Sequence, residues 1–225
     1  MLLTAIGAFL GAVLSIIISI VFENQRNPKL QFTIENPPVD MTYQNAPANK
    51  ARFLRVQLWN KALPKIFRWL SRNAAMHCNV DIEILHFEDF APVFSHQIPG
   101  RWAGADEPIS PQFDPKTGNV ATLFDVSKYN AAFRRNCYAG SKETIDIVAR
   151  FDTDSDCYIW NNNSYLFGWK NDELKIPKGR YFVIVTVFSA GEKTRGYFKL
   201  ENTVSVQDFR LLDVNKEEKK VLSKK

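Results

Sequence analysis

Hydrophobic and polar positions divide the chain into an uncharged N-terminal run and a longer region of alternating residues. No charged side chain occurs between Met1 and Phe22, and Glu23 is the first one. Residues Leu2 to Phe22 provide about 21 apolar, helix-compatible positions, which at ~1.5 Å per residue span roughly 31 Å, the thickness of a bilayer's hydrocarbon core. The pattern predicts a transmembrane helix over residues 1–22 and a juxtamembrane linker over residues 23–28.

Beyond this run, apolar and polar residues alternate with a period of two. In the clearest segment, Cys78, Val80, Ile82 and Ile84 share one face, and polar residues occupy the other. Similar alternation covers residues 30–34, 54–58 and 145–149, whereas residues 181–188 are apolar on both faces, as in a central strand. Such patterns are typical of antiparallel sheets with one buried face. They predict a mainly β fold, an antiparallel β-sandwich over residues 29–212, followed by a solvated basic tail over 213–225.

Two segments carry a family resemblance. Phe53–Asn60, followed by Ala74–Ile82, resembles the B and C strands of bacterial immunoglobulin-like adhesion-related domains, in which one strand ends in Asn and a small residue opens the next. Pro177 and Tyr181 resemble the start of strand F in fibronectin type III and related sandwiches, where a Tyr hydroxyl reaches back to the backbone. The chain departs from that pattern at Lys175, where a Leu is usual. The resemblance implies an immunoglobulin-like fold but no particular activity.

The apolar run has the features of an uncleaved anchor. It lacks a basic side chain before it, it is longer than a signal-peptide core, and bulky residues occupy its C-terminal end. Arg26 and Lys29 follow it, so the positive-inside bias predicts a cytoplasmic soluble domain. An odd number of cysteines, Cys78, Cys137 and Cys157, is consistent with a reducing compartment.

Gly7 and Gly11 form a G-x-x-x-G spacing within the apolar run. Small residues one turn apart let two membrane helices approach closely, so a homodimer through this helix is one interpretation. The other, which we favour, is that glycine is common in membrane helices.

The overall charge argues against a nucleic-acid partner. The chain carries 29 basic and 24 acidic residues, a net charge of +5, without a concentrated basic face or a recognised motif. Since residues 1–22 predict a membrane span, the partners expected are the lipid bilayer and a protein.

A basic segment near residues 64–72 is a candidate membrane contact. Lys65, Arg68 and Arg72 recur at helical spacing after Pro64, with Trp69 among them, which predicts a short amphipathic helix. One interpretation docks this helix on anionic headgroups with Trp69 at the boundary. The favoured alternative is a connecting helix that packs its apolar stripe on the sandwich.

Arg101 and Trp102 lie together in a segment flanked by Gly100 and Gly104. Arg beside Trp is a composition enriched at binding hot spots. An equally weighted alternative is that the Trp fills the end of the sandwich, stacked by Arg101.

Neither a metal site nor a catalytic site is predicted. The acidic run Asp152–Asp156 begins like a calcium loop, but Cys157 and Asn163 occupy positions that require Gly and Glu. An acidic turn is the simpler interpretation. No zinc, P-loop or nucleophile motif occurs, and no cofactor is expected. The sequence favours a membrane-anchored binding or scaffolding module, with a membrane-anchored hydrolase as the alternative.

Overall fold

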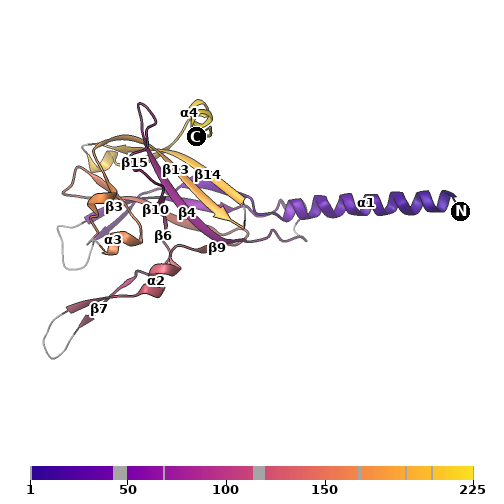
Figure 1. The fold of residues 1–225 in the computed structure, drawn as a ribbon, viewed down its shortest axis with the longest axis horizontal. Helices are drawn as coiled ribbons and strands as arrows, with labels where there is room; N and C mark the ends of the chain where they lie inside the picture. Colours follow the sequence, from indigo (N-terminus) through magenta and orange to yellow (C-terminus); the bar gives the residue numbers. More distant parts are fainter. Residues whose placement is uncertain are drawn as a thin grey trace.

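The computed structural model describes residues 2–42, 50–67, 69–113, 120–166, 169–190, 192–203 and 205–224. A single long helix, α1 (Leu2–Arg26), projects from one end of a body built of antiparallel strands (Figure 1). Within this part of the chain, α1 is the one helix long and apolar enough to cross a membrane, and it is unburied along its apolar window. The mainly β, antiparallel character predicted from the alternation is confirmed.

The first sheet orders its strands β1-β3-β10-β11-β12, with β2 also paired to β3 and β6 to β10. Their bounds are β1 Leu30–Ile34, β2 Val39–Thr42, β3 Lys50–Asn60, β6 Arg101–Trp102, β10 Lys142–Phe151, β11 Cys157–Ile159 and β12 Lys175–Ile176. Strands β3 and β10 form its centre, pairing from Trp59 opposite Lys142 to Ala51 opposite Phe151.

The second sheet orders its strands β15-β14-β13-β4-β5, with β9 also paired to β4. Their bounds are β4 Ala75–His86, β5 Ile98–Pro99, β9 Arg135–Cys137, β13 Gly179–Ser189, β14 Glu192–Asn202 and β15 Arg210–Asp213. A separate hairpin, β7 (Ile109–Phe113) with β8 (Val120–Phe124), lies away from the body (Figure 1). The remaining short helices are α2 Val126–Ala131, α3 Asn162–Leu166, α4 Lys216–Leu222, and the 3-10 turns η1 Lys65–Phe67, η2 Asp172–Leu174 and η3 Val206–Asp208.

The two sheets share one hydrophobic core. Val56 and Ile145 from the first sheet and Ile82 and Val185 from the second are all fully or almost fully buried in the same cluster. The alternating residues of 54–58 and 78–84 therefore face this core, whereas the alternation over 145–149 breaks at a bulge after Asp146, so that Val148 joins the core and Ala149 packs in another cluster. Strand β13 is covered on both sides as predicted, because Phe182 and Ile184 pack in a second cluster on its outer face.

The predicted tail over 213–225 forms helix α4, and most of its described residues are exposed as expected, but one buried residue holds it on the body. Helix α4 begins at a capping box in which Asn215 and Glu218 exchange hydrogen bonds of 2.8 Å. Its Leu222 is fully buried beside Phe182 and Ile184. A local charge count misses this packing because a single Leu in a short basic segment carries the contact.

Two boundaries near the N-terminus also need correction. Helix α1 continues to Arg26, so most of the predicted linker 23–28 is helical and only Asn27 to Lys29 connect α1 to β1. The predicted basic helix near 64–72 is reduced to the single turn η1, Lys65–Phe67. A short isolated helix has little stability of its own. The end of this segment instead forms hydrogen bonds from Asn73 to Arg26, the last residue of α1, and from Arg72 to Asn27.

The packing of Leu222 is testable by truncating its side chain. Leu222→Ala should lower the free energy of unfolding of the detergent-solubilised chain by about 2–5 kcal/mol, because it opens a cavity in the outer cluster. Val221 is its matched control, since its side chain is 46% exposed, and Val221→Ala should change stability by less than about 0.5 kcal/mol. Equal thermal midpoints for the two variants would show that α4 does not contribute to the core.

Candidate functional site

The buried side chain of Asn60 joins α1 to both sheets. Asn60 ends β3 and is fully buried. Its amide nitrogen donates to the carbonyls of Asn73 and Cys137, at 3.0 Å each, and its carbonyl oxygen accepts from the backbone N–H of Lys29 at 3.2 Å. One side chain therefore ties Lys29, in the connection between α1 and β1, to the segment before β4 and to the end of β9.

Further contacts fix the end of α1 to the segment before β4. The backbone N–H of Asn73 donates to the Arg26 carbonyl at 2.7 Å, and Arg72 donates to the Asn27 carbonyl at 2.5 Å. Arg72 is buried, so its predicted place on an exposed membrane-facing surface is wrong. Its guanidinium instead satisfies a carbonyl next to the C-terminus of α1, where helix carbonyls lack intrahelical partners.

The aromatic residue of this segment contacts α1 itself. The Trp69 ring packs edge-to-face on Phe22, with ring centroids 5.3 Å apart, while 68% of Trp69 stays exposed. Lys29, three residues after α1, and Lys65, four residues before Trp69, are both exposed. Arg26 forms an ion pair with Glu23, with 3.3 Å between the guanidinium nitrogen and the carboxylate oxygen. Arg68 lies outside the described residues. We call this region, from Phe22 to Lys29 together with Asn60 and Lys65 to Asn73, the junction.

Arg101 and Trp102 do not belong to an accessible surface. They form β6 and are 2% and 1% exposed, so the interpretation of an exposed binding loop is wrong. Trp102 donates to the Cys78 carbonyl at 3.2 Å, and Arg101 stacks over Tyr165. The alternative interpretation is right that Trp102 is buried in the core, but Arg101 stacks on Tyr165 and not on Trp102.

Arg101 belongs to a buried ionic cluster on the first sheet. Asp146 accepts from Arg55 at 2.6 Å, and Arg101 lies 3.9 Å away on its other side. Burial raises the pKa of the Asp146 carboxyl, and the two guanidiniums oppose that shift. The hollow that Asp146 shares with Glu107 and Tyr165 has a volume of about 60 Å³, which is far smaller than the usual pocket for a small molecule.

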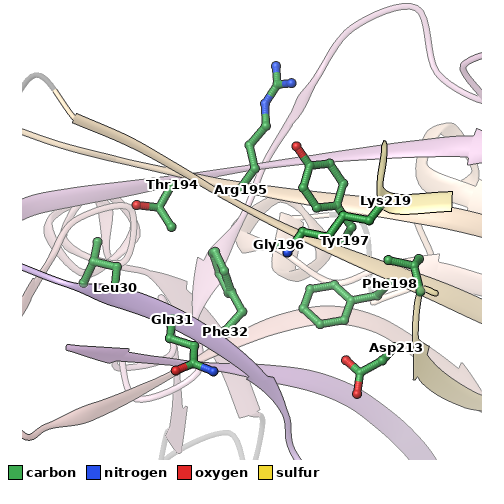
Figure 2. A pocket seen from close by; sticks show the side chains of 11 residues that line it. Leu30, Gln31, Phe32, Thr194, Arg195, Gly196, Tyr197, Phe198, Asp213 and Lys219 are labelled. Atoms are coloured by element: carbon green, nitrogen blue, oxygen red, sulfur yellow. The ribbon is translucent and has the colours of Figure 1, made fainter. Parts of the chain in front are cut away.

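A larger hollow lies between strand β1 and strands β14 and β15 (Figure 2). Its volume is about 350 Å³. Phe32 and Phe198 meet edge-to-face across it, and a side chain on Gly196 would lie within 2.8 Å of the Phe32 ring. The glycine therefore lets β1 and β14 approach each other. The remaining lining is mostly polar or charged and includes Gln31, Thr194, Arg195, Asp213 and Lys219.

Neither a metal nor a thiol site emerges in the described part of the chain. It contains no group of three His, Cys, Asp or Glu residues placed to hold a metal ion. Within the acidic turn, Asp154 pairs with Lys170 and Asp156 with Lys175. The three cysteines are free and fully buried.

Gly7 and Gly11 lie on the projecting part of α1. A Cβ built on either residue meets no atom within 4 Å. This face of the helix is open to a second helix or to lipid, and the homodimer stays a prediction.

The Asn60 network is the functional feature that sequence reasoning missed. An Asn at a strand end was visible in the sequence, but its partners are 31, 13 and 77 residues away. The only local signal was the resemblance, in which a strand ends in Asn.

Comparisons with protein-family models, with curated proteins and with solved structures find no match for this chain.

The junction is testable at Asn60. Asn60→Ala should lower the free energy of unfolding by at least about 2 kcal/mol, because it leaves buried carbonyls without donors. Amide hydrogen exchange at Lys29 and Asn73 should accelerate before global unfolding. Asn79 is exposed on β4 and serves as the control. Asn79→Ala should change the free energy of unfolding by less than about 0.5 kcal/mol and should leave amide exchange at Lys29 and Asn73 as in the wild type. Unchanged exchange at Lys29 in Asn60→Ala would contradict this role.

Proposed function

We propose that the chain is a single-span membrane protein whose β-rich body is held against the cytoplasmic membrane surface as a binding or scaffolding module. The observation that carries the proposal is the junction, in which the end of an exposed apolar helix is hydrogen-bonded into the body. A helix of this length and apolarity is stable in lipid, where every backbone polar group is satisfied within the helix.

The contacts at the end of α1 favour an anchor over a signal peptide. Trp69 packs on Phe22, and the Arg26 carbonyl accepts from Asn73, so the helix is part of the folded body's own contact network. The bulky residues before Glu23 point the same way.

The same contacts support a position of the body close to the bilayer. Phe22 ends the uncharged run, and the four residues from Glu23 to Arg26 add only ~6 Å of helix. The headgroup layer is about 5–8 Å thick on each side. Asn27 therefore emerges near its outer edge, and Trp69, in contact with Phe22, lies at the interface where Trp is enriched.

The charges favour the cytoplasmic side. Arg26 and Lys29 follow the span, and Lys65 lies exposed in the segment that contacts it. Basic residues near an anionic leaflet contribute on the order of 1 kcal/mol each. Three free, buried thiols are consistent with a reducing compartment.

The immunoglobulin-like resemblance gains support from one contact. Tyr181 donates its hydroxyl hydrogen to the Pro177 carbonyl at 3.0 Å, as a tyrosine corner requires. We propose an immunoglobulin-like sandwich on this basis, and the fold itself implies no particular activity.

Binding is favoured over hydrolysis by the shapes of the hollows. The hollow that holds Asp146 and Glu107 is too small for a substrate, and Asp146 is engaged by Arg55. A hollow of about 420 Å³ is lined by Asp40 and Asp152, but Asp40 is paired with Arg52 at 2.7 Å. The hollow between β1 and β14 is larger and combines an apolar floor with a polar rim, which suits a protein partner. A membrane-anchored hydrolase is the alternative if acids converge elsewhere.

The orientation is testable by thiol labelling in whole cells. The native cysteines are fully buried, so Lys178→Cys, at an exposed position, supplies the accessible thiol. A membrane-impermeant maleimide should label it only after the membrane is opened with detergent. The unsubstituted chain is the control for background labelling.

Two results would contradict the proposal. Labelling in intact cells would place the body outside. Release of a chain lacking residues 1–22 would identify the apolar run as a signal peptide.

A further inference from the structure

A second hollow of about 350 Å³ opens beside β9. His77, Arg134, Arg135, Asn136, Tyr138 and Glu143 line it. These residues come from the start of β4, from β9 with its flanking residues, and from β10.

The backbone at His77 is held in an unusual conformation. The pairing of β4 with β9 is interrupted by a bulge between Ala75 and Cys78, and His77 has a φ of +52°. The backbone N–H of His77 donates to the side-chain amide oxygen (Oδ1) of Asn136 at 2.9 Å. A non-glycine residue in this region costs about 1–3 kcal/mol and persists where the surroundings fix it. The bulge redirects His77 out of the alternation of the strand and into the hollow.

The side chains around the hollow are predominantly donors. No hydrogen bond or ion pair within the described residues engages the side chains of His77, Arg134 or Tyr138. Asn136 uses its side-chain oxygen for His77, which leaves its side-chain N–H groups available.

One acid balances part of the charge. Glu143 accepts from Arg135 Nε at 2.9 Å, so the terminal N–H groups of Arg135 are not used in that bond. With Arg134 and Arg135 against Glu143, the hollow keeps a positive charge even when His77 is neutral.

The hollow lies at the end of the body that faces α1. The Cys137 carbonyl, between Asn136 and Tyr138, accepts from Asn60, which also binds Lys29. The backbone N–H of Gly140 donates to the Asn60 carbonyl at 2.7 Å. Figure 1 shows β9 on the side of the body toward α1. In the proposed arrangement, this end meets the headgroup layer.

We propose that this hollow binds the terminal phosphate of a phosphomonoester. Two guanidiniums, an imidazole, an amide and a phenol supply charge-assisted and neutral donors to three phosphate oxygens. Its lipid source would be a headgroup such as that of phosphatidic acid, and its soluble source a free phosphate compound. The lipid assignment rests on the proposed membrane position, whereas the phosphate chemistry does not.

The test uses the full chain in neutral detergent micelles and isothermal titration calorimetry. Inorganic phosphate, short-chain phosphatidic acid and short-chain phosphatidylglycerol are the three probes. Phosphatidic acid should bind more tightly than phosphatidylglycerol, whose phosphate is a diester. Arg134→Gln and His77→Asn should each weaken its binding at least about tenfold, the usual size of a lost hydrogen bond to a charged group.

Matched variants keep the outcome interpretable. Asn tolerates a positive φ, so His77→Asn preserves the bulge, and Arg134 is exposed, so both variants should keep the wild-type thermal midpoint. Lys142→Gln removes an exposed charge that does not line the hollow, and should change affinity less than about twofold.

Each outcome decides the proposal. Tighter binding of phosphatidic acid than of inorganic phosphate identifies the lipid as the source, and equal binding identifies a soluble phosphate compound. Absence of binding, unchanged affinity in Arg134→Gln and His77→Asn, or equal losses in Lys142→Gln would overturn it. The micelle measurement is independent of the labelling experiment, so a failed membrane orientation leaves this test valid.

Discussion

The arrangement of helix and body depends on the buried amide of Asn60. A buried amide is costly unless its donors and acceptor are paired, and here both ends of the amide have partners. Those partners belong to the connection after α1, the segment before β4, and β9. The same hydrogen bonds that satisfy the amide therefore fix where the helix leaves the body. The buried Arg72 and the Asn73–Arg26 bond act on the same connection.

The short connection between α1 and β1 determines which end of the body lies close to the helix. With only Asn27 to Lys29 between α1 and β1, the end of the body that carries β9 follows the helix end closely. Trp69, the exposed lysines and the donor-lined hollow at His77 all belong to this end or to the segment that contacts the helix. In the proposed membrane setting, their charges and aromatic ring meet headgroups, while the hollow between β1 and β14 stays available to a protein.

The sequence predicted the strands that have a periodic pattern of apolar residues, but it did not predict contacts between residues distant in the sequence. Alternation identified β3, β4 and β10, and the apolar run 181–188 identified the doubly covered β13, because strand periodicity is a local property. It failed for Arg72 and Leu222 and left two interpretations open for Arg101, because the burial of all three depends on partners distant in sequence. A basic residue in a polar stretch is normally solvated, and Leu222 is a single apolar residue near charged ones, so nothing local marked Arg72 or Leu222 as buried. For the same reason, the candidate site was predicted only at Trp69, Lys65 and the charges after the span, while Asn60 and His77 were not recognised.

The depth of Trp69 in a bilayer distinguishes a body held at the membrane surface from one that projects away from it. The full chain and its Trp69→Phe variant would be reconstituted in vesicles whose lipids carry bromine at defined positions along the acyl chains. The fluorescence difference between the two chains isolates Trp69. Our account predicts that this difference is quenched, and most strongly by bromine near the headgroups, because Trp69 contacts Phe22 at the end of the span. A Trp69 signal that is insensitive to brominated lipid at every depth would show that the body is not held at the membrane surface.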